Sequence, residues 1–529
     1  MVYAIGVLFS FLVYIVIGIF LSKKISNVED YFVSGRNAST LLITGSLVAS
    51  FLSTVSFMGE AGFSYEGYPI LLLILTIFNG SGYILGVVLF GRYLRRSESL
   101  TVPEYFGRRF NSTKVRRAAG ITTIIGIAAY LVAVTQGGAL LLSSILDVPY
   151  TVALVIMWIA YTSFTFLSGA KGVLVNDTLM FIIFLVAVFV AVPYIIYASG
   201  GWPEALINTS TLNSRPDILS WHGLTGKNAS MGTPMEALGW AIIMGLVWGT
   251  VVSVSPWQTS RYLMAKNEHV AIRSGVFAMI ALLFIYLFLH IGMAAVSSIN
   301  PDINPTEQVF IWSAINILPT SIGVLALTGI MAAALSSCST FLQLIGNSVA
   351  HDLSFKKKSD KSALKFSRLS MIGASIVIFI ITLWQPPAIM WVGYFAATLF
   401  AASWGPVAFT SIYSKRINSE GAFWSIVMGF LGVIAGELIQ KVGVSLPVYL
   451  NPAIIGVVLS IISLVVGSRL GTVTEKEVLF RKELLKRPED FDNEKDMSIT
   501  KRYPKILIGS GVTLIIITFV FYYLPLYME

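Results

Sequence analysis

Four hydroxyl side chains lie almost side by side in a stretch that is otherwise apolar, GIMAAALSSCSTFLQLIGNSVA, which begins at residue 329. They are Ser336, Ser337, Ser339 and Thr340. In a helix of 3.6 residues per turn, Ser336 and Ser337 share one face with Ala333, and Ser336, Ser339 and Thr340 share the adjacent face. Sodium is a hard cation that binds several oxygens, and neutral hydroxyls with free carbonyls supply these without burying an uncompensated carboxylate. The pattern therefore indicates a candidate cation site.

The same hydroxyls also have a purely structural interpretation. Small residues let membrane helices pack closely, and a Ser or Thr hydroxyl often bonds back to a carbonyl of its own helix. An ion site is favoured only if freed carbonyls are present as well. Such carbonyls are expected where a broken helix unwinds, around Ala49 and Leu52.

The composition places these segments in a membrane. The chain has 529 residues, of which 56% are hydrophobic and 12% charged, with a mean hydropathy of +0.79, and this excludes a soluble globule. A membrane span needs about 20 mostly apolar residues. Fourteen such spans are predicted, at residues 2–22, 40–61, 69–91, 119–146, 149–169, 174–198, 236–260, 275–298, 319–350, 367–384, 388–413, 420–440, 449–467 and 504–526. The first is interpreted as an uncleaved helix, and the only cysteine, Cys338, excludes an intrachain disulfide.

The basic residues predict the orientation, because Lys and Arg accumulate on the cytoplasmic side of a membrane. With the N-terminus outside, the external loops hold only Arg215, Lys227 and Lys441 of the 36 Lys and Arg residues, and the other 33 are cytoplasmic. This predicts a multi-pass protein of the cell membrane with both termini external. The net charge of +9 then reflects topology and contact with lipid headgroups, so no nucleic acid is needed to explain it.

Two of the predicted spans are interrupted at corresponding positions. Gly, Ser and Thr break TGSLVASFLSTVSFMGEAGFSYEG, and five spans later GLVWGTVVSVSPWQTSRYL is broken by Gly249, Ser253, Ser255 and Pro256. Paired interruptions indicate an inverted repeat with a binding site near the membrane midplane. We therefore predict an all-α polytopic membrane protein with four parts: a leading helix at 1–22, five-helix repeats at 40–198 and 236–413, and peripheral helices at 420–526 that include a cytosolic segment at 468–503.

From residue 27 to about residue 440 the chain resembles the sodium:solute symporter family. The motifs that carry the resemblance occur in order: NVEDYFVSGRN, LTVPEYFGRRF, VLVNDTLMF, SPWQTSRYLMAK, AAALSSCST, LWQPPAIMWV and IYSKRINSEGAFWSIVMGF. The resemblance implies the inverted-repeat fold of the bacterial leucine transporter, with one helix before a ten-helix core and three after it. It also implies transport by alternating access with sodium as the coupling ion.

The resemblance implies sodium ligands as well. A first site would use backbone oxygens of Ala49, Leu52 and Ala333 with the hydroxyls of Ser336 and Ser337. A possible second site would consist of Asp177, Ser339 and Thr340, with Ser336 as a shared ligand. The alternative for Asp177 is that it caps its helix at the cytoplasmic start.

Polar and aromatic residues of several spans are candidates for binding the solute. They are Ser53, Ser56, Tyr130, Gln136, Trp248, Ser253, Trp257 and Tyr394. The alternative is that the aromatic residues serve packing and interfacial anchoring. Glu60 is a candidate for contact with the solute or for the outer gate, and His290 is interpreted as a packed, hydrogen-bonded histidine. Phe51 stands where proline permeases have an aspartate, and the arginine of sialic acid transporters has no counterpart here.

The predicted function is sodium-coupled import of a small polar organic solute. VNDT and WQPP are most similar to the pantothenate permeases, which makes a small carboxylate or amide metabolite the leading substrate class. An alternative is a membrane module that senses solute occupancy through a separate partner. A membrane enzyme is disfavoured, because the spans contain no His, Asp and Glu metal cluster and no nucleophile constellation.

Overall fold

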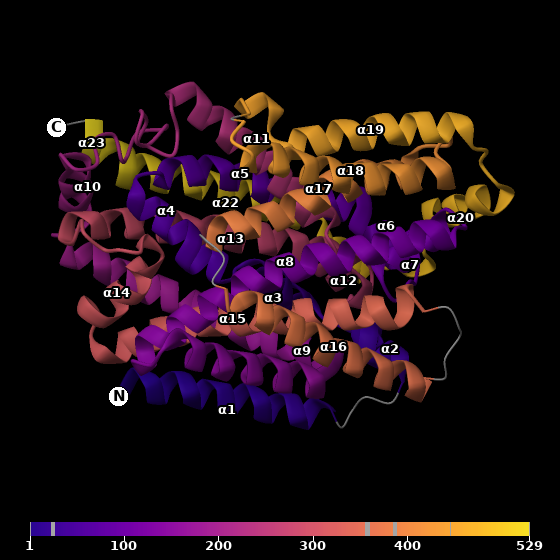
Figure 1. Cartoon of the computed structure of the whole chain (residues 1–529), viewed down its shortest axis with the longest axis horizontal. Helices are drawn as coiled ribbons and strands as arrows, with labels where there is room; N and C mark the ends of the chain where they lie inside the picture. Colours follow the sequence, from indigo (N-terminus) through magenta and orange to yellow (C-terminus); the bar gives the residue numbers. More distant parts are fainter. Residues whose placement is uncertain (1, 23–26, 355–359, 385–388, 445, 528–529) are drawn as a thin grey trace.

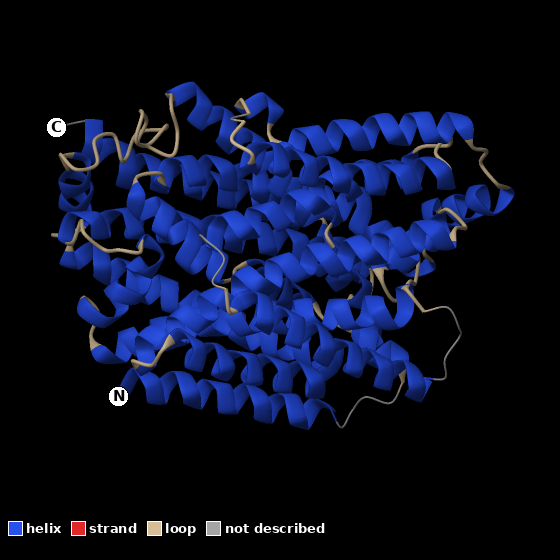
Figure 2. Cartoon of the chain, in the orientation of Figure 1, coloured by secondary structure: helices blue, strands red, loops and turns tan. Residues whose placement is uncertain are grey.

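The computed structural model describes residues 2–22, 27–354, 360–384, 389–444 and 446–527. This part of the chain is a bundle of helices without strands, joined by short loops (Figure 2). The longer helices are α1 (Val2–Ser22), α5 (Pro69–Gly86), α8 (Thr113–Leu146), α9 (Tyr150–Ala198), α11 (Pro234–Val254), α13 (Glu268–Ile299), α15 (Thr320–Asn347), α16 (Asp360–Thr382), α17 (Ile389–Tyr413), α18 (Ser419–Lys441), α19 (Pro452–Leu470) and α22 (Tyr503–Thr518).

Shorter helices and turns connect or extend these. The short α-helices are α2 (Val28–Val33), α3 (Thr40–Phe51), α4 (Ala61–Glu66), α6 (Arg92–Arg96), α7 (Val102–Arg109), α10 (Trp202–Ser210), α12 (Pro256–Met264), α14 (Val309–Asn316), α20 (Glu475–Leu485), α21 (Glu494–Thr500) and α23 (Leu524–Tyr527). The π-helical turns are η2 (Val55–Glu60), η3 (Val87–Gly91), η5 (Ser348–Asp352) and η8 (Phe519–Tyr523). The 3₁₀ turns are η1 (Ser34–Arg36), η4 (Thr306–Gln308), η6 (Val448–Leu450) and η7 (Glu489–Asp492).

The fourteen predicted spans all coincide with helical segments. In the described residues, twelve helical segments are long and apolar enough to cross a membrane, and the bent pair Thr40–Phe51 and Val55–Glu66 gives a thirteenth. The remaining predicted span corresponds to the shorter apolar helix Tyr150–Phe166. The sequence predicted a gap between the fifth and sixth spans, but α9 runs through both of them. It is interrupted only at Gly169, whose φ of 56° and ψ of −177° suit a residue without a Cβ atom.

The helices run mostly along the long axis of the molecule, and the beginning of α1 lies at the same end as α23 (Figure 1). An even number of membrane crossings would place both ends of the chain on the same side of the membrane. The opposite end carries α7 and α20 (Figure 1). The central helices α3, α8, α9 and α15 pack against one another, while α18 and α19 pair with each other beside α17.

Both predicted helix breaks are present, and each has a local cause. Helix α3 ends at Phe51, Leu52 has an extended backbone (φ −71°, ψ 116°), and the chain resumes after a bend of 56°. In the second broken helix, Ser255 is extended (φ −62°, ψ 148°) between α11 and α12. Pro256 follows it, and a proline disfavours the helical conformation of the preceding residue. The two breaks therefore expose backbone groups inside the bundle.

The crossing of α5 and α11 depends on glycine. A Cβ atom on Gly82 would lie 2.2 Å from the carbonyl oxygen of Gly249, so the two backbones are in direct contact. We expect Gly82→Ala to destabilise the protein by about 1 to 3 kcal/mol through overpacking. Thermal unfolding of the purified protein measures this, with Gly509→Ala as the control, because a Cβ atom there meets nothing within 4 Å. Equal unfolding temperatures for the two variants would contradict the proposed contact.

Part of one family motif lies outside the described residues. In LWQPPAIMWV, the described residues include Trp384 and Ile389 but not the QPPA segment between them.

Candidate functional site

The α15 residues predicted for the first sodium site belong to the segment 329–343, in which every residue is buried. Ala333, Ser336 and Ser337 are completely buried, and α15 packs against α3, α8 and α9. The Ser337 hydroxyl has no hydrogen-bond partner in the structure. A buried polar group without a partner costs about 1 to 3 kcal/mol, so this hydroxyl is available to a ligand.

The broken end of α3 supplies backbone oxygens. The N–H of Leu52 donates to the carbonyl of Val48 at 2.9 Å and ends the helix. Carbonyls in the last turn of a helix have no partner within it, and the carbonyl of Ala49 belongs to that turn. Carbonyls on α3 and hydroxyls on the adjacent α15 are the neutral oxygen donors that a hard monovalent cation requires. The donor chemistry therefore fits sodium.

Asp177 lies in the interior of the bundle on α9 and is completely buried. Its carboxylate accepts hydrogen bonds from the hydroxyls of Ser46 at 2.5 Å and Ser336 at 2.6 Å. The residue stands inside a helix that begins at Tyr150, and it is eight positions past the break at Gly169. The interpretation of Asp177 as a cap at the start of its helix is therefore wrong.

Arg261 of α12 reaches the same carboxylate and was not predicted as a site residue. Its Nη2 atom donates to Asp177 at 3.3 Å and to the Thr340 hydroxyl at 2.5 Å, and its side chain is buried. The Ser339 hydroxyl instead donates to the carbonyl of Ser336 in its own helix, at 2.9 Å. The structure thus brings Asp177 and Thr340 together around a cationic group. In the sequence, the feature that could have indicated this contact is the arginine inside the second broken helix.

The predicted aromatic residues form one cluster at the centre of the bundle. Trp248 has its ring centroid 6.2 Å from that of Tyr130, 5.3 Å from Tyr394 and 5.5 Å from Phe51. Tyr130 in turn contacts Trp257 at 5.6 Å. These residues come from α3, α8, α11, α12 and α17, so both broken helices contribute to the cluster.

Glu60 adjoins this cluster at the end of η2. Its Oε1 atom accepts a hydrogen bond from the Tyr394 hydroxyl at 2.8 Å. The predicted residue Ser56 lies in the same turn and shares a hydrogen bond of 2.9 Å with Tyr286. His290 packs flat on Tyr286 and bonds to a serine hydroxyl of α4, in agreement with its interpretation as a packed histidine.

The three remaining predicted solute residues are Ser253, Ser53 and Gln136. The Ser253 hydroxyl donates to the carbonyls of Gly82 at 2.9 Å and of Gly249 at 2.7 Å, so it joins α11 to α5. The Ser53 hydroxyl accepts from the N–H of Val55 beside the helix break. Gln136 is buried on α8.

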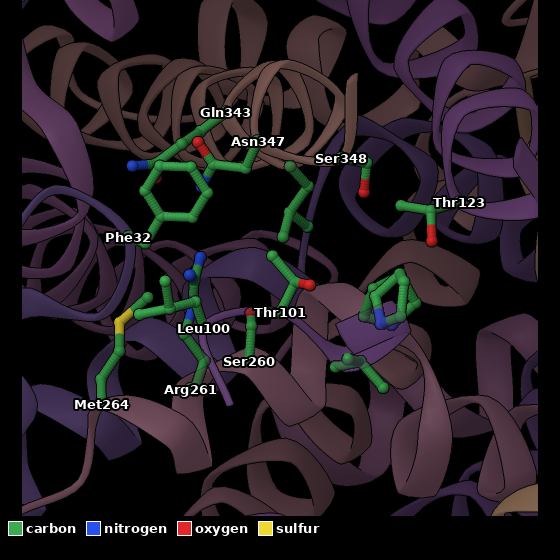
Figure 3. A pocket seen from close by; sticks show the side chains of 14 residues that line it. Phe32, Leu100, Thr101, Thr123, Ser260, Arg261, Met264, Gln343, Asn347 and Ser348 are labelled. Atoms are coloured by element: carbon green, nitrogen blue, oxygen red, sulfur yellow. The ribbon is translucent and has the colours of Figure 1, made fainter. Parts of the chain in front are cut away.

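Cavities of different sizes lie on the side where α12 ends, and one of about 280 Å³ is lined by Arg96, Asn267 and Glu268. A cavity of about 20 Å³, the room of about one water molecule, lies between Thr101, Arg261 and Asn347 (Figure 3). Beyond it, Asp352 accepts hydrogen bonds from Thr101 at 2.7 Å and from Arg116 at 3.2 Å. At the opposite end, where α11 begins, a cavity of about 260 Å³ reaches Tyr394.

Broken helices around a candidate cation site, in an all-helical protein with many membrane spans, are typical of ion-coupled secondary transporters. A sequence model of the Sodium:solute symporter family matches residues 31–429, and the chain belongs to this family. The curated relatives are transporters and not enzymes, and sodium is the coupling ion that the family indicates.

Two relatives and one solved structure illustrate the similarity. The sodium/pantothenate symporter of Escherichia coli (strain K12) is 22% identical over 455 residues, which cover 84% of this chain and 91% of the relative. The osmoregulated proline transporter OpuE of Bacillus subtilis (strain 168) is 26% identical over 474 residues, which cover 86% of this chain and 93% of the relative. The substrate-bound outward-open structure of a Na⁺-coupled sialic acid symporter superimposes with a TM-score of 0.75 at 19% identity, over 90% of this chain and 99% of that one. The predicted fold class is confirmed.

Proposed function

We propose that the protein couples downhill sodium entry to the import of a small polar organic solute by alternating access. The observation that carries the proposal is the buried, unpartnered hydroxyl of Ser337 on the helix that packs against the broken end of α3. The first sodium ion would bind the oxygens of Ala49, Leu52, Ala333, Ser336 and Ser337.

The proposed substrate is a small polar organic solute, and no single compound is proposed. A pantothenate-like carboxylate or amide metabolite is the leading prediction from the sequence, and the relative from Escherichia coli is named for pantothenate. The carboxylate of Glu60 is hydrogen-bonded to Tyr394 of the aromatic cluster. The basic side chain described at the possible second sodium site is that of Arg261, and it contacts Asp177. A negative charge beside the aromatic cluster favours recognition of a positively charged group of the solute over recognition of a carboxylate.

Uptake into proteoliposomes tests the function. We expect accumulation of labelled solute when sodium outside exceeds sodium inside, and none when potassium replaces sodium. Candidate solutes come from a thermal-unfolding screen of the purified protein against metabolites, with and without sodium. Sodium-dependent binding without uptake would support the alternative, a sensor of solute occupancy.

A second sodium ion is proposed at Asp177, Ser339 and Thr340. Asp177 and Thr340 already converge on one cationic group, and Arg261 contacts this carboxylate through a single nitrogen at 3.3 Å. A bidentate pair would be held more strongly. We propose that Arg261 withdraws when the second sodium ion binds.

The orientation in the cell membrane is a further prediction. Because 33 of the 36 Lys and Arg residues fall on one side under the assigned topology, both termini should be external. A C-terminal reporter that is active only outside the cytosol should therefore be active. A fusion that is active only in the cytosol would contradict the orientation.

A further inference from the structure

Glu60 is a buried carboxyl group that the sodium sites do not use. It lies in η2, the turn that follows the first helix break, and only 5% of the residue is exposed. Its Oε1 atom accepts the hydrogen bond from Tyr394. Its Oε2 atom has no partner of hydrogen-bond geometry among the described residues, and the hydroxyls of Ser56 and Tyr286 lie beside the carboxyl group. The ion pairs found among the described residues do not include Glu60.

A carboxylate in this position needs a positive partner. Burying an ionised carboxylate without a counter-charge is costly, so such a group either carries a proton or pairs with a cation. Asp177, which is equally deep in the bundle, has Arg261 as its partner, whereas Glu60 has no such partner among the described residues. In the empty site Glu60 is therefore suited to carry a proton, and a bound cation could take the place of that proton.

The surroundings of Glu60 are suited to an organic cation. Tyr394 stacks on Trp240 with ring centroids 6.1 Å apart and an angle of 7° between the rings. It also contacts Trp391 at 6.2 Å and Trp248 at 5.3 Å. The faces of aromatic rings attract ammonium groups. An ionised carboxylate beside these rings would attract the same group through its full negative charge.

A cavity at the end of the bundle where α11 begins comes as near to Glu60 as the tyrosine that bonds to it, and Glu60 itself does not line this cavity. The cavity of about 260 Å³ is lined by Trp240, Trp391 and Tyr394, and Tyr394 is the residue that bonds to Glu60. Glu236 and Glu437 also line this cavity, and its described lining contains no Lys, Arg or His, although Lys441 lies near Glu437. An acidic, aromatic entrance attracts positively charged solutes and disfavours anions.

We propose that Glu60 and the tyrosine and tryptophan residues around it bind the ammonium group of the transported solute. The substrate class is then a small organic cation, or a zwitterion recognised through its ammonium group. This inference rests on the proposed transport function, and it replaces the pantothenate-like class predicted from the sequence with a solute that carries an ammonium group. Glu60 would carry a proton in the empty site and lose it to the bulk solution when the ammonium group binds.

Thermal unfolding of the full-length purified protein tests the inference with paired probes of equal shape. Choline and 3,3-dimethyl-1-butanol differ only in the quaternary nitrogen that replaces a carbon, and tetramethylammonium serves as a minimal cation. With ionic strength held by KCl, we expect the two cations to raise the unfolding temperature and the neutral alcohol to have no effect. The variant Glu60→Gln retains an oxygen that accepts from Tyr394 but loses the charge. Its apparent affinity for the cations should be lower by about thirtyfold or more.

The control and the sodium response separate the possible outcomes. Glu204→Gln removes an exposed carboxylate of α10 and should bind the cations like the native protein. Equal responses of the native protein and Glu60→Gln, no response to either cation, or an equal response to the neutral alcohol would each overturn the inference. Sodium should stabilise both proteins whatever the cations do, and a native protein that does not respond to sodium would contradict the proposed transport function instead.

Discussion

Alanine at Ser337 is expected to raise the sodium concentration for half-maximal uptake about tenfold, and alanine at both Ser336 and Ser337 about a hundredfold or more. A hydrogen-bonding oxygen that contacts a charged group contributes about 1.5 to 3 kcal/mol, and 1.4 kcal/mol corresponds to a factor of ten in affinity. The double variant removes two of the five proposed ligands and leaves three backbone oxygens, so some sodium binding should remain. Sodium titrations of uptake in proteoliposomes measure both shifts.

The single variant is the sharper test, because the Ser337 hydroxyl makes no hydrogen bond to the described residues of the protein. Its removal should leave stability without sodium unchanged or slightly higher, while the stabilisation by sodium decreases. A packing role predicts no change in the sodium response. Ser425→Ala is the matched control, because it removes a buried hydroxyl that bonds to Ser460 between α18 and α19, outside the site. An unchanged sodium requirement in Ser337→Ala would show that Ser337 serves packing and is not a sodium ligand.

The features that the sequence predicted well are those set by local patterns. Apolar runs of span length gave the helices, and Pro256 with the Ser- and Thr-rich segment near Leu52 gave the two breaks. The hydroxyl face of α15 followed from helical periodicity alone. In each case the determinants lie within a few residues of one another, so no knowledge of the tertiary structure was needed.

The features that were missed depend on contacts between distant segments. Arg261 is 84 positions from Asp177 in the sequence, and no local pattern indicates which carboxylate a buried arginine will face. Tyr286, which bonds to Ser56 across 230 positions, was missed for the same reason. The continuity of α9 past Gly169 was missed because glycine between two apolar runs resembles a loop as much as a local break.

The pair of Asp177 and Arg261 gives the second large prediction. Removing one partner of a buried ion pair leaves an uncompensated charge and costs about 3 to 5 kcal/mol. In sodium-free buffer, Asp177→Asn and Arg261→Gln should therefore each destabilise the protein strongly. The double variant should recover much of this loss, because neither charge remains. Thermal unfolding of the native protein, the two single variants and the double variant gives the interaction free energy between positions 177 and 261.

Sodium should then distinguish the two single variants. Arg261→Gln leaves the Asp177 carboxylate unpaired beside the hydroxyls of Ser336 and Thr340, and a cation in that position would restore the charge balance. Sodium should therefore rescue Arg261→Gln far more than Asp177→Asn, in which the second site has lost its charge. Reversal potentials should give two sodium ions per solute for the native protein and one for the double variant. A native ratio of one, together with equal rescue of both single variants, would show that Arg261 is the permanent counter-ion of Asp177. The protein would then move a single sodium ion, bound at the first site, with each solute.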